Sequence, residues 1–243
     1  MCQMCEQPQQ ENSRRGFLSL LGAAATAGYA LAGNALAAEV KAPPKPQNVV
    51  TPDAALALLA AGNKRYVEGV MRRHDFRNER EPLAKGQNPY AAILSCADSR
   101  IAPELAFDSA RGDLFVCRVA GNFANDDIVA SLEYAVAVLK TPLIMVLGHS
   151  ACGAVSSTIE SLRDNTTLPG HLPSLVANLT PAVKASQGKP GDLLDNAIRQ
   201  NVSDTVQKLK GAAPILNASV TAAKLKIVGA VYRLADGRVD IVA

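Results

Sequence analysis

The sequence predicts an α/β fold: a mainly parallel central β-sheet of about four strands plus a C-terminal antiparallel edge strand, flanked by helices. Short apolar runs of strand length alternate with longer segments of helical periodicity, which is the pattern that builds a parallel sheet. The 243 residues, 48% of them hydrophobic, suffice for one buried core of this kind. Asp236-Gly237, which lies between two apolar runs, predicts the hairpin that adds the edge strand.

The N-terminus, residues 1–37, resembles a twin-arginine export signal peptide. Arg14 and Arg15 precede an apolar run from Leu18 to about Ala32, and Ala35-Leu36-Ala37 offers a small-residue cleavage site. A short membrane anchor is the alternative, although the run is below the roughly 20 residues that span a bilayer. We therefore expect cleavage after Ala37, export to the periplasm or the cell exterior, and no stable membrane insertion of the mature chain.

Residues 38–50 are expected to form an extended linker, because Pro43, Pro44 and Pro46 exclude a helix. Residues 51–243 then form a single domain. Thr51-Pro52-Asp53 has the composition of a helix start and predicts a helix over Ala54–Glu68. The charge-dense segment Met71–Glu81, which includes His74, is expected to be a solvated loop.

The remaining elements follow from periodicity and turn residues. Strands are predicted over four apolar runs, Tyr90–Ser95, Leu114–Val119, Leu143–Leu147 and Lys226–Tyr232, with Arg238–Val242 as the edge strand. A helical turn is predicted at Pro103-Glu104-Leu105, and helices over Asn125–Lys140, Ala151–Arg163, Ser174–Gln187, Asp192–Leu209 and Pro214–Lys224. A polar loop that contains Pro169, Gly170 and Pro173 is expected before the helix that starts at Ser174.

Charge and cysteine content narrow the function. The net charge of +3, the interspersed signs and the absence of Trp give no support for a nucleic-acid surface. The five cysteines are too few and too scattered for a disulfide scaffold, and Cys2 and Cys5 would leave with the signal. Of the three that remain, Cys117 sits on a predicted strand without a partner and is expected to be a buried, inert thiol.

The other two cysteines lie in short runs that each follow a predicted strand. Cys96 begins one run, and His149-Ser150-Ala151-Cys152 forms the other, so both runs lie at the carboxyl ends of strands, where open α/β sheets bind ligands. Catalytic zinc sites use three Cys and His ligands and keep a fourth position open. Cys96, His149 and Cys152 are therefore candidate zinc ligands; buried cysteines and a satisfied histidine are the alternative.

A carboxylate and a guanidinium accompany the first run. Asp98 beside Arg100 would remain ionised and could accept a hydrogen bond from a zinc-bound hydroxide, orienting its lone pair toward a substrate. Two alternatives remain open at this point: an ordinary ion pair that fixes the loop, or Asp98 as a conditional fourth ligand that closes the site.

The runs C-x-D-x-R at 96–100 and H-x-x-C-G at 149–153 resemble the motifs of the β-class carbonic anhydrases, and the resemblance extends from about Ala60 to the C-terminus. It implies one Zn²⁺ per subunit, held by Cys96, His149 and Cys152, with Asp98 and Arg100 as the catalytic dyad. The implied reaction is the reversible hydration of CO2 to bicarbonate and a proton by attack of zinc-bound hydroxide.

Further positions resemble the plant-type branch of that family. Gln87 stands where this branch hydrogen-bonds the substrate, Phe115 and Tyr134 fit its pocket positions, and Gly153 would let the helix N-terminus approach the metal loop. Ile93 replaces the tryptophan of the bicarbonate-regulated branch, so we expect no inhibitory bicarbonate site. Ala97 stands where many members have Ser. We expect Asp98 to stay off the metal near pH 7.

Other functions use the same residues. A related zinc hydrolase would act on carbon disulfide or carbonyl sulfide, whereas a structural zinc protein or thiol redox sensor would have a fourth ligand or an oxidisable Cys96–Cys152 pair. A hydrolase with a cysteine nucleophile is weaker, because metal would occupy both thiols. The resemblance also implies a homodimer or higher homo-oligomer, with the helix Ala54–Glu68 reaching over a neighbouring subunit and the sheet edge extending across the interface.

Overall fold

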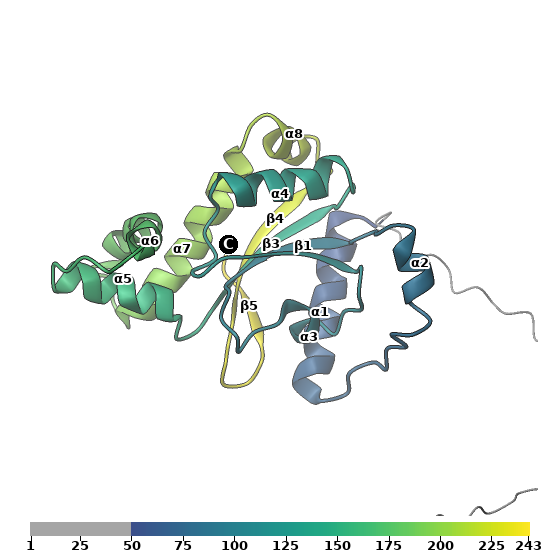
Figure 1. The fold of residues 1–243 in the computed structure, drawn as a ribbon, viewed down its shortest axis with the longest axis horizontal. Coiled ribbons are helices and arrows are strands. Elements are labelled where there is room, and N and C mark those ends of the chain that lie inside the picture. The colour runs from purple at the N-terminus through teal and green to yellow at the C-terminus, as the bar shows by residue number, and fades with distance from the viewer. Residues whose placement is uncertain (1–49) are drawn as a thin grey trace, which may run out of the picture. The chain divides into compact units, whose positions relative to one another are not determined.

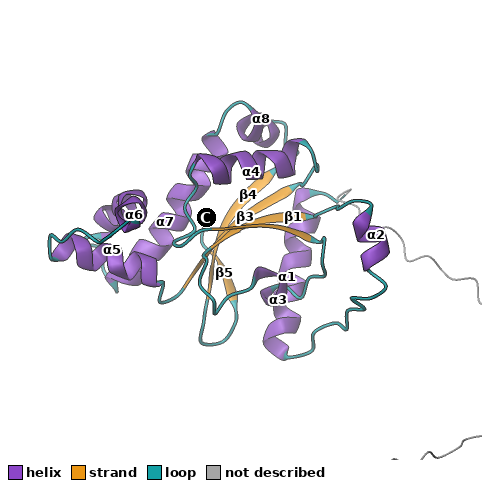
Figure 2. Ribbon diagram, in the orientation of Figure 1, coloured by secondary structure: helices purple, strands orange, loops and turns teal. Residues whose placement is uncertain are grey.

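The computed structural model describes residues 50–243. The predicted signal peptide and the linker, apart from Val50, lie outside the described residues. Within 50–243, a central sheet is covered by helices on both faces (Figures 1 and 2). No helix in this part of the chain has the length and apolar character needed to span a bilayer.

The sheet has five strands in the order β2-β1-β3-β4-β5. The first four strands are parallel to one another, and β5 pairs with β4 in the antiparallel direction. Every residue of β1 and β3 is buried, as expected for strands covered on both sides. The predicted fold class is therefore confirmed. The bounds are β1 Ala91–Ser95, β2 Leu114–Arg118, β3 Leu143–His149, β4 Lys226–Tyr232 and β5 Val239–Ile241.

Alternate strand residues face two hydrophobic layers. Helices α1 (Pro52–Glu68) and α3 (Pro103–Ala106) lie on the face to which Ile93 and Met145 contribute. Helices α4 (Asp126–Ala137), α7 (Leu193–Gly211) and α8 (Ile215–Thr221) lie on the face of Leu94 and Val146. The helices α5 (Gly153–Arg163) and α6 (Leu172–Ser186) pack against α7, and α2 (Arg80–Ala84) precedes β1.

Several helix ends differ from the prediction. Helix α5 begins at Gly153 because Ala151 has a left-handed φ of 52°, which no helix accommodates. Helix α4 ends at Ala137, ahead of Lys140, which has a left-handed φ of 59°. Helix α6 begins at Leu172 and includes Pro173, because the first turn of a helix does not need the N–H that proline lacks.

The charge-dense segment that precedes α2 is not simply solvated. The backbone N–H and the guanidinium of Arg72 donate hydrogen bonds to the fully buried Asp108 carboxylate, which also forms an ion pair with Arg65 of α1. His74 Nε2 lies 3.7 Å from the same carboxylate. Burial alone would raise the pKa of Asp108, but the hydrogen bonds from Arg65 and Arg72 outweigh it and lower that pKa. This carboxylate anchors the segment to the domain.

Candidate metal centre

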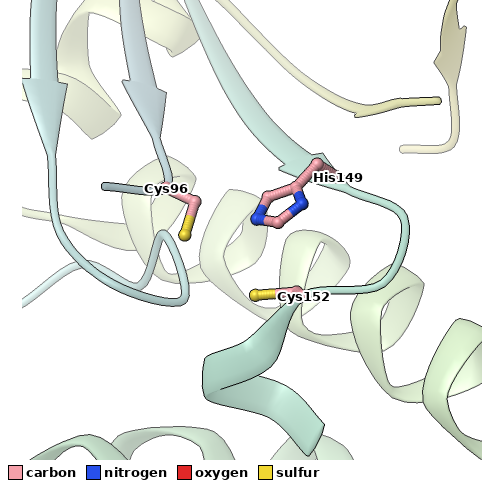
Figure 3. A group of neighbouring side chains, drawn as sticks. All are labelled: Cys96, His149 and Cys152. Atoms are coloured by element: carbon pink, nitrogen blue, oxygen red, sulfur yellow. The ribbon is translucent and has the colours of Figure 1, made fainter. Parts of the chain in front are cut away.

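Two neighbouring strands bring the three candidate ligands together. Cys96 directly follows β1, and His149 is the last residue of β3; the two strands pair in parallel up to Ser95 and Leu147. Cys152 lies just before α5. One ligand atom from each side chain lies within 4.8 Å of the other two, and Figure 3 shows the side chains converging. All three residues are buried, so the group is shielded from water.

The His149 ring is oriented to offer one nitrogen to this group. Its Nδ1 lies 3.0 Å from the Ser150 carbonyl oxygen, to which it donates a hydrogen bond in the neutral tautomer. Nε2 is then unprotonated, and it is buried without a hydrogen bond to any of residues 50–243. In metal-binding histidines, a backbone carbonyl commonly accepts a hydrogen bond from the ring nitrogen that does not bind the metal, and this bond fixes the tautomer. Two thiols and one imidazole nitrogen are donors that zinc prefers, so the residues fit this metal.

The two neighbouring thiols shift each other's pKa in opposite directions. A hydrogen bond from Cys152 lowers the pKa of Cys96 to about 4, and the His149 side chain and the Gly121 N–H, 3.3 Å from Sγ, act in the same direction. The same bond, together with burial, raises the pKa of Cys152. Burial lowers the pKa of His149, but the neighbouring Cys96 thiolate outweighs it and raises that pKa. Zinc binds cysteines as thiolates, so metal binding would release the thiol protons.

Asp98 lies beside the group and is held by Arg100. Its Oδ1 accepts from the backbone N–H and Nε of Arg100, both at 2.9 Å, and its Oδ2 accepts from Nη2 at 2.7 Å. These bonds lower the pKa of Asp98 well below its usual value. Oδ2 is also 3.8 Å from His149 Nε2. Arg100 Nη2 further donates to the Ala151 carbonyl at 3.2 Å, so this guanidinium ties the two motif loops together.

Two residues that support the centre come from strand β2 and the loop after it, and neither was identified as a site residue from the sequence. Arg118 donates to the carbonyl oxygens of Cys96, Asp98 and Ile101 at 2.9, 2.7 and 3.0 Å, and so clamps the loop after β1. The only sequence signal for Arg118 is a charged residue at the end of an apolar strand. Gly121 acts through its backbone N–H, and it has a left-handed φ of 85°.

The predicted substrate-binding residues lie elsewhere, with one exception. Gln87 is exposed in the loop before β1, and Phe115 pairs with Ala92 near the start of β1. At about 3.3 Å per strand residue, the position of Phe115 is roughly 13 Å from Cys96 along the strand. The ring of Phe115 lies 6.2 Å from that of Tyr134, which is 48% exposed. Only Gly153, which starts α5 next to Cys152, adjoins the centre.

The predicted inert thiol is buried as expected. Cys117 is free and 8% exposed, and its pKa is raised by burial. It is not part of the ligand group of Cys96, His149 and Cys152.

Comparison with known proteins gives the family. A family model described as "Carbonic anhydrase" matches residues 91–239, which hold all of these ligands. The solved structure of the β-carbonic anhydrase CcaA superposes with a TM-score of 0.59 at 31% identity, over 77% of this chain and 98% of that chain. This chain belongs to the β-carbonic anhydrase family.

Sequence relatives in this family are similar over most of their length. The carbonic anhydrase of Mycolicibacterium smegmatis is 37% identical over 191 residues, which cover 78% of this chain and 93% of that protein. Carbonic anhydrase 2 of Mycobacterium tuberculosis is 38% identical over 189 residues, which cover 77% and 91%. Both matches cover most of the described β-carbonic anhydrase domain.

Proposed function

We propose that this β-carbonic anhydrase catalyses the reversible hydration of CO2 to bicarbonate and a proton, with one zinc ion held by Cys96, His149 and Cys152. The observation that carries the proposal is the buried group of two thiols and one imidazole with an ionised, arginine-bound carboxylate beside it. The names of the relatives support the same activity. They do not favour the alternatives, a carbon disulfide or carbonyl sulfide hydrolase or a structural zinc protein.

Zinc bound by three protein ligands would supply a water whose pKa is lowered toward about 7, which is a nucleophile at neutral pH. Asp98 would accept a hydrogen bond from that water and so orient it, because an ionised carboxylate is only an acceptor. Arg100 keeps Asp98 ionised and holds both of its carboxylate oxygens by hydrogen bonds. We therefore propose that Asp98 stays off the metal near pH 7.

The positions of the residues that suggest the plant-type branch have a consequence for the oligomeric state. Gln87, Phe115 and Tyr134 lie toward the amino ends of β1 and β2, whereas the ligands lie at the carboxyl ends of β1 and β3. These three side chains therefore cannot reach the metal centre of their own chain. If they bind substrate, they do so in the site of a second copy, which supports a homodimer or a higher homo-oligomer. Tyr134, half exposed beside Phe115, is suited to such a contact.

Export is proposed from the sequence alone. Arg14 and Arg15 before a modest apolar run, followed by Ala35-Leu36-Ala37, support cleavage of a twin-arginine signal and a periplasmic enzyme. Cell fractionation with an antibody to the mature domain tests it. Recovery of the uncleaved chain in the cytoplasm would contradict it.

The activity is tested by metal analysis and stopped-flow CO2 hydration on the zinc-loaded protein. We expect about one zinc per chain and hydration that depends on the metal. An Asp98→Ala variant should keep its zinc and lose most of the activity. A zinc-loaded wild-type protein that does not hydrate CO2 above the buffer rate would overturn the proposal.

A further inference from the structure

We infer that Asn201, on helix α7, is a positioning residue for the Cys96 thiolate and acts through Gly121. The inference rests on the proposed zinc centre. Asn201 is not in the ligand group, and 105 positions separate it from Cys96 in the chain. Its side chain is 4% exposed, and its Nδ2 donates to the Gly121 carbonyl oxygen at 2.8 Å. The N–H of the same glycine donates to Cys96 Sγ at 3.3 Å.

Gly121 is confined on more than one side. Its left-handed φ of 85° suits glycine, and a Cβ at this position would lie 2.9 Å from Leu179 Cδ1 of α6. Leu179 therefore blocks movement in one direction, while Asn201 holds the carbonyl. Because both ends of this residue are fixed, its N–H keeps its direction toward the Cys96 sulfur. An N–H that points at a thiolate stabilises the charged form and sets the direction of its free lone pairs.

Helix α7 can place Asn201 accurately because it packs directly on the sheet. A Cβ on Gly148 would lie 2.7 Å from Val202 Cγ2, and one on Gly229 would lie 2.6 Å from Val202 Cγ1. The two glycines thus let α7 approach β3 and β4 closely. Gly148 directly precedes His149, so adjacent residues of α7 contact the segments that carry two different ligands. Asn201 links the helix to Cys96 through hydrogen bonds by way of Gly121, and Val202 packs against Gly148, the residue before His149.

A merely structural role for Asn201 must be separated from this positioning role, and the chain offers a matched control. Asn63 of α1 is also a buried asparagine, 8% exposed, and its Nδ2 donates to the carbonyl oxygens of Ala106 and Gly237 at 2.9 and 2.8 Å. Among the described residues, neither Ala106 nor Gly237 forms a hydrogen bond with Cys96, His149 or Cys152. Removal of Asn201 leaves the Gly121 carbonyl without this partner, and removal of Asn63 does the same to two carbonyls and to the N–H of Val239. Both changes should therefore lower the unfolding temperature. Only the loss of Asn201 should alter the metal centre.

The experiment compares wild type, Asn201→Ala and Asn63→Ala as full chains. We measure zinc release to a chromogenic chelator and, after cobalt(II) substitution, the thiolate-to-cobalt charge-transfer band. Asn201→Ala should release zinc about tenfold faster and shift the band. Loss of a group that orients a metal ligand typically costs about 10–100-fold in metal affinity. Asn63→Ala should match wild type in both the rate of zinc release and the position of the cobalt band. Asn201→Leu and Asn63→Leu, with the same branching and number of side-chain heavy atoms as asparagine but without an N–H donor, repeat the comparison if the alanine variants do not fold.

The inference is overturned if the folded Asn201 variants release zinc at the wild-type rate with an unshifted cobalt band. It is equally overturned if the Asn63 variants change both readouts to the same extent. A wild-type protein that binds no zinc would instead remove the proposed metal centre itself, so the two failures are distinguishable.

Discussion

The position of Gln87 leads to a prediction about two copies of the chain. We expect Gln87→Ala and Asp98→Asn each to reduce CO2 hydration on the order of 100-fold, as the loss of one polar contact to the reacting groups commonly does. Gln87 precedes Ala91, the first residue of β1, whereas Asp98 follows its last residue. The five-residue strand alone spans about 16 Å, which a glutamine side chain cannot bridge. The two side chains can therefore meet in one site only if they come from different copies.

Co-expression of the Gln87→Ala and Asp98→Asn variants gives a quantitative test of whether one site uses residues from two copies. If copies pair at random, about half of the pairs contain one copy of each variant, and one of the two sites in such a pair has neither substitution. Stopped-flow hydration should then recover to about a quarter of the wild-type rate, well above that of either variant alone. This recovered fraction of the wild-type rate stays the same if the pairs assemble into larger oligomers. Size-exclusion chromatography with light scattering tests whether the copies associate.

A control pair sharpens the result. Asp98→Asn co-expressed with His149→Ala should show no recovery, because both substitutions affect the same end of β1 and β3 and every site keeps one of them. If the Gln87 and Asp98 variants also fail to complement, Gln87 does not act in the site of a second copy. If Gln87→Ala alone is as active as wild type, Gln87 has no role in substrate binding and the plant-type assignment loses its support.

Three further predictions concern a single chain. Asp98→Asn should keep its full zinc content by metal analysis, because Asp98 is outside the ligand group, and a loss of zinc would contradict this. Removal of zinc with a chelator should lower the unfolding temperature, and added zinc should restore it, since a ligand of the folded state stabilises that state; an unchanged temperature would argue against a metal centre. Asp108→Asn should cost about 3 kcal/mol at pH 7 by urea unfolding, because it breaks a buried charge pair. Asparagine tolerates the left-handed φ of 43° at this position, so strain does not add to the cost. The folded-state pKa of Asp108 is lowered, so its contribution is complete above the unfolded value of about 3.9 and is lost as pH falls through the folded value. An equal cost at pH 7 and in strong acid would contradict the last prediction.

Strands β1 and β3 were predictable from the sequence because each is an almost continuous apolar run, which is the pattern of a strand covered on both faces. Leu143–His149 differs from its predicted range only at the carboxyl end, where Gly148 and His149 extend it. The helix ends were less predictable, because the backbone angle of one residue decides them. Nothing in the composition around Ala151 indicates its left-handed φ, yet that angle moves the start of α5 by two residues.

The centre was predictable to the extent that its chemistry resides in side chains. Cys96, His149 and Cys152 identify themselves by residue type and by their position after strands. Gly121 contributes a backbone N–H, a group that every residue except proline has, so no sequence pattern can single it out. Asn201 is recognisable only once the fold places α7 against the loop after β2. Hydrophobic periodicity predicts contacts within a helix or strand, so it cannot predict a hydrogen bond between residues 80 positions apart, such as Gly121 and Asn201.

The contacts of Asp98 also bear on whether the site is open. A shift of its carboxylate onto zinc would disturb the three hydrogen bonds that it accepts from Arg100. Movement of the whole loop is opposed as well, because Arg118 holds the carbonyls of both Cys96 and Asp98, and Cys96 must stay in place as a ligand. Arg100 is anchored in turn to the Ala151 carbonyl, so it cannot follow the carboxylate without releasing the second motif loop. Each restraint supports the proposal that Asp98 stays beside the metal rather than on it, which would leave the fourth zinc position to water and substrate.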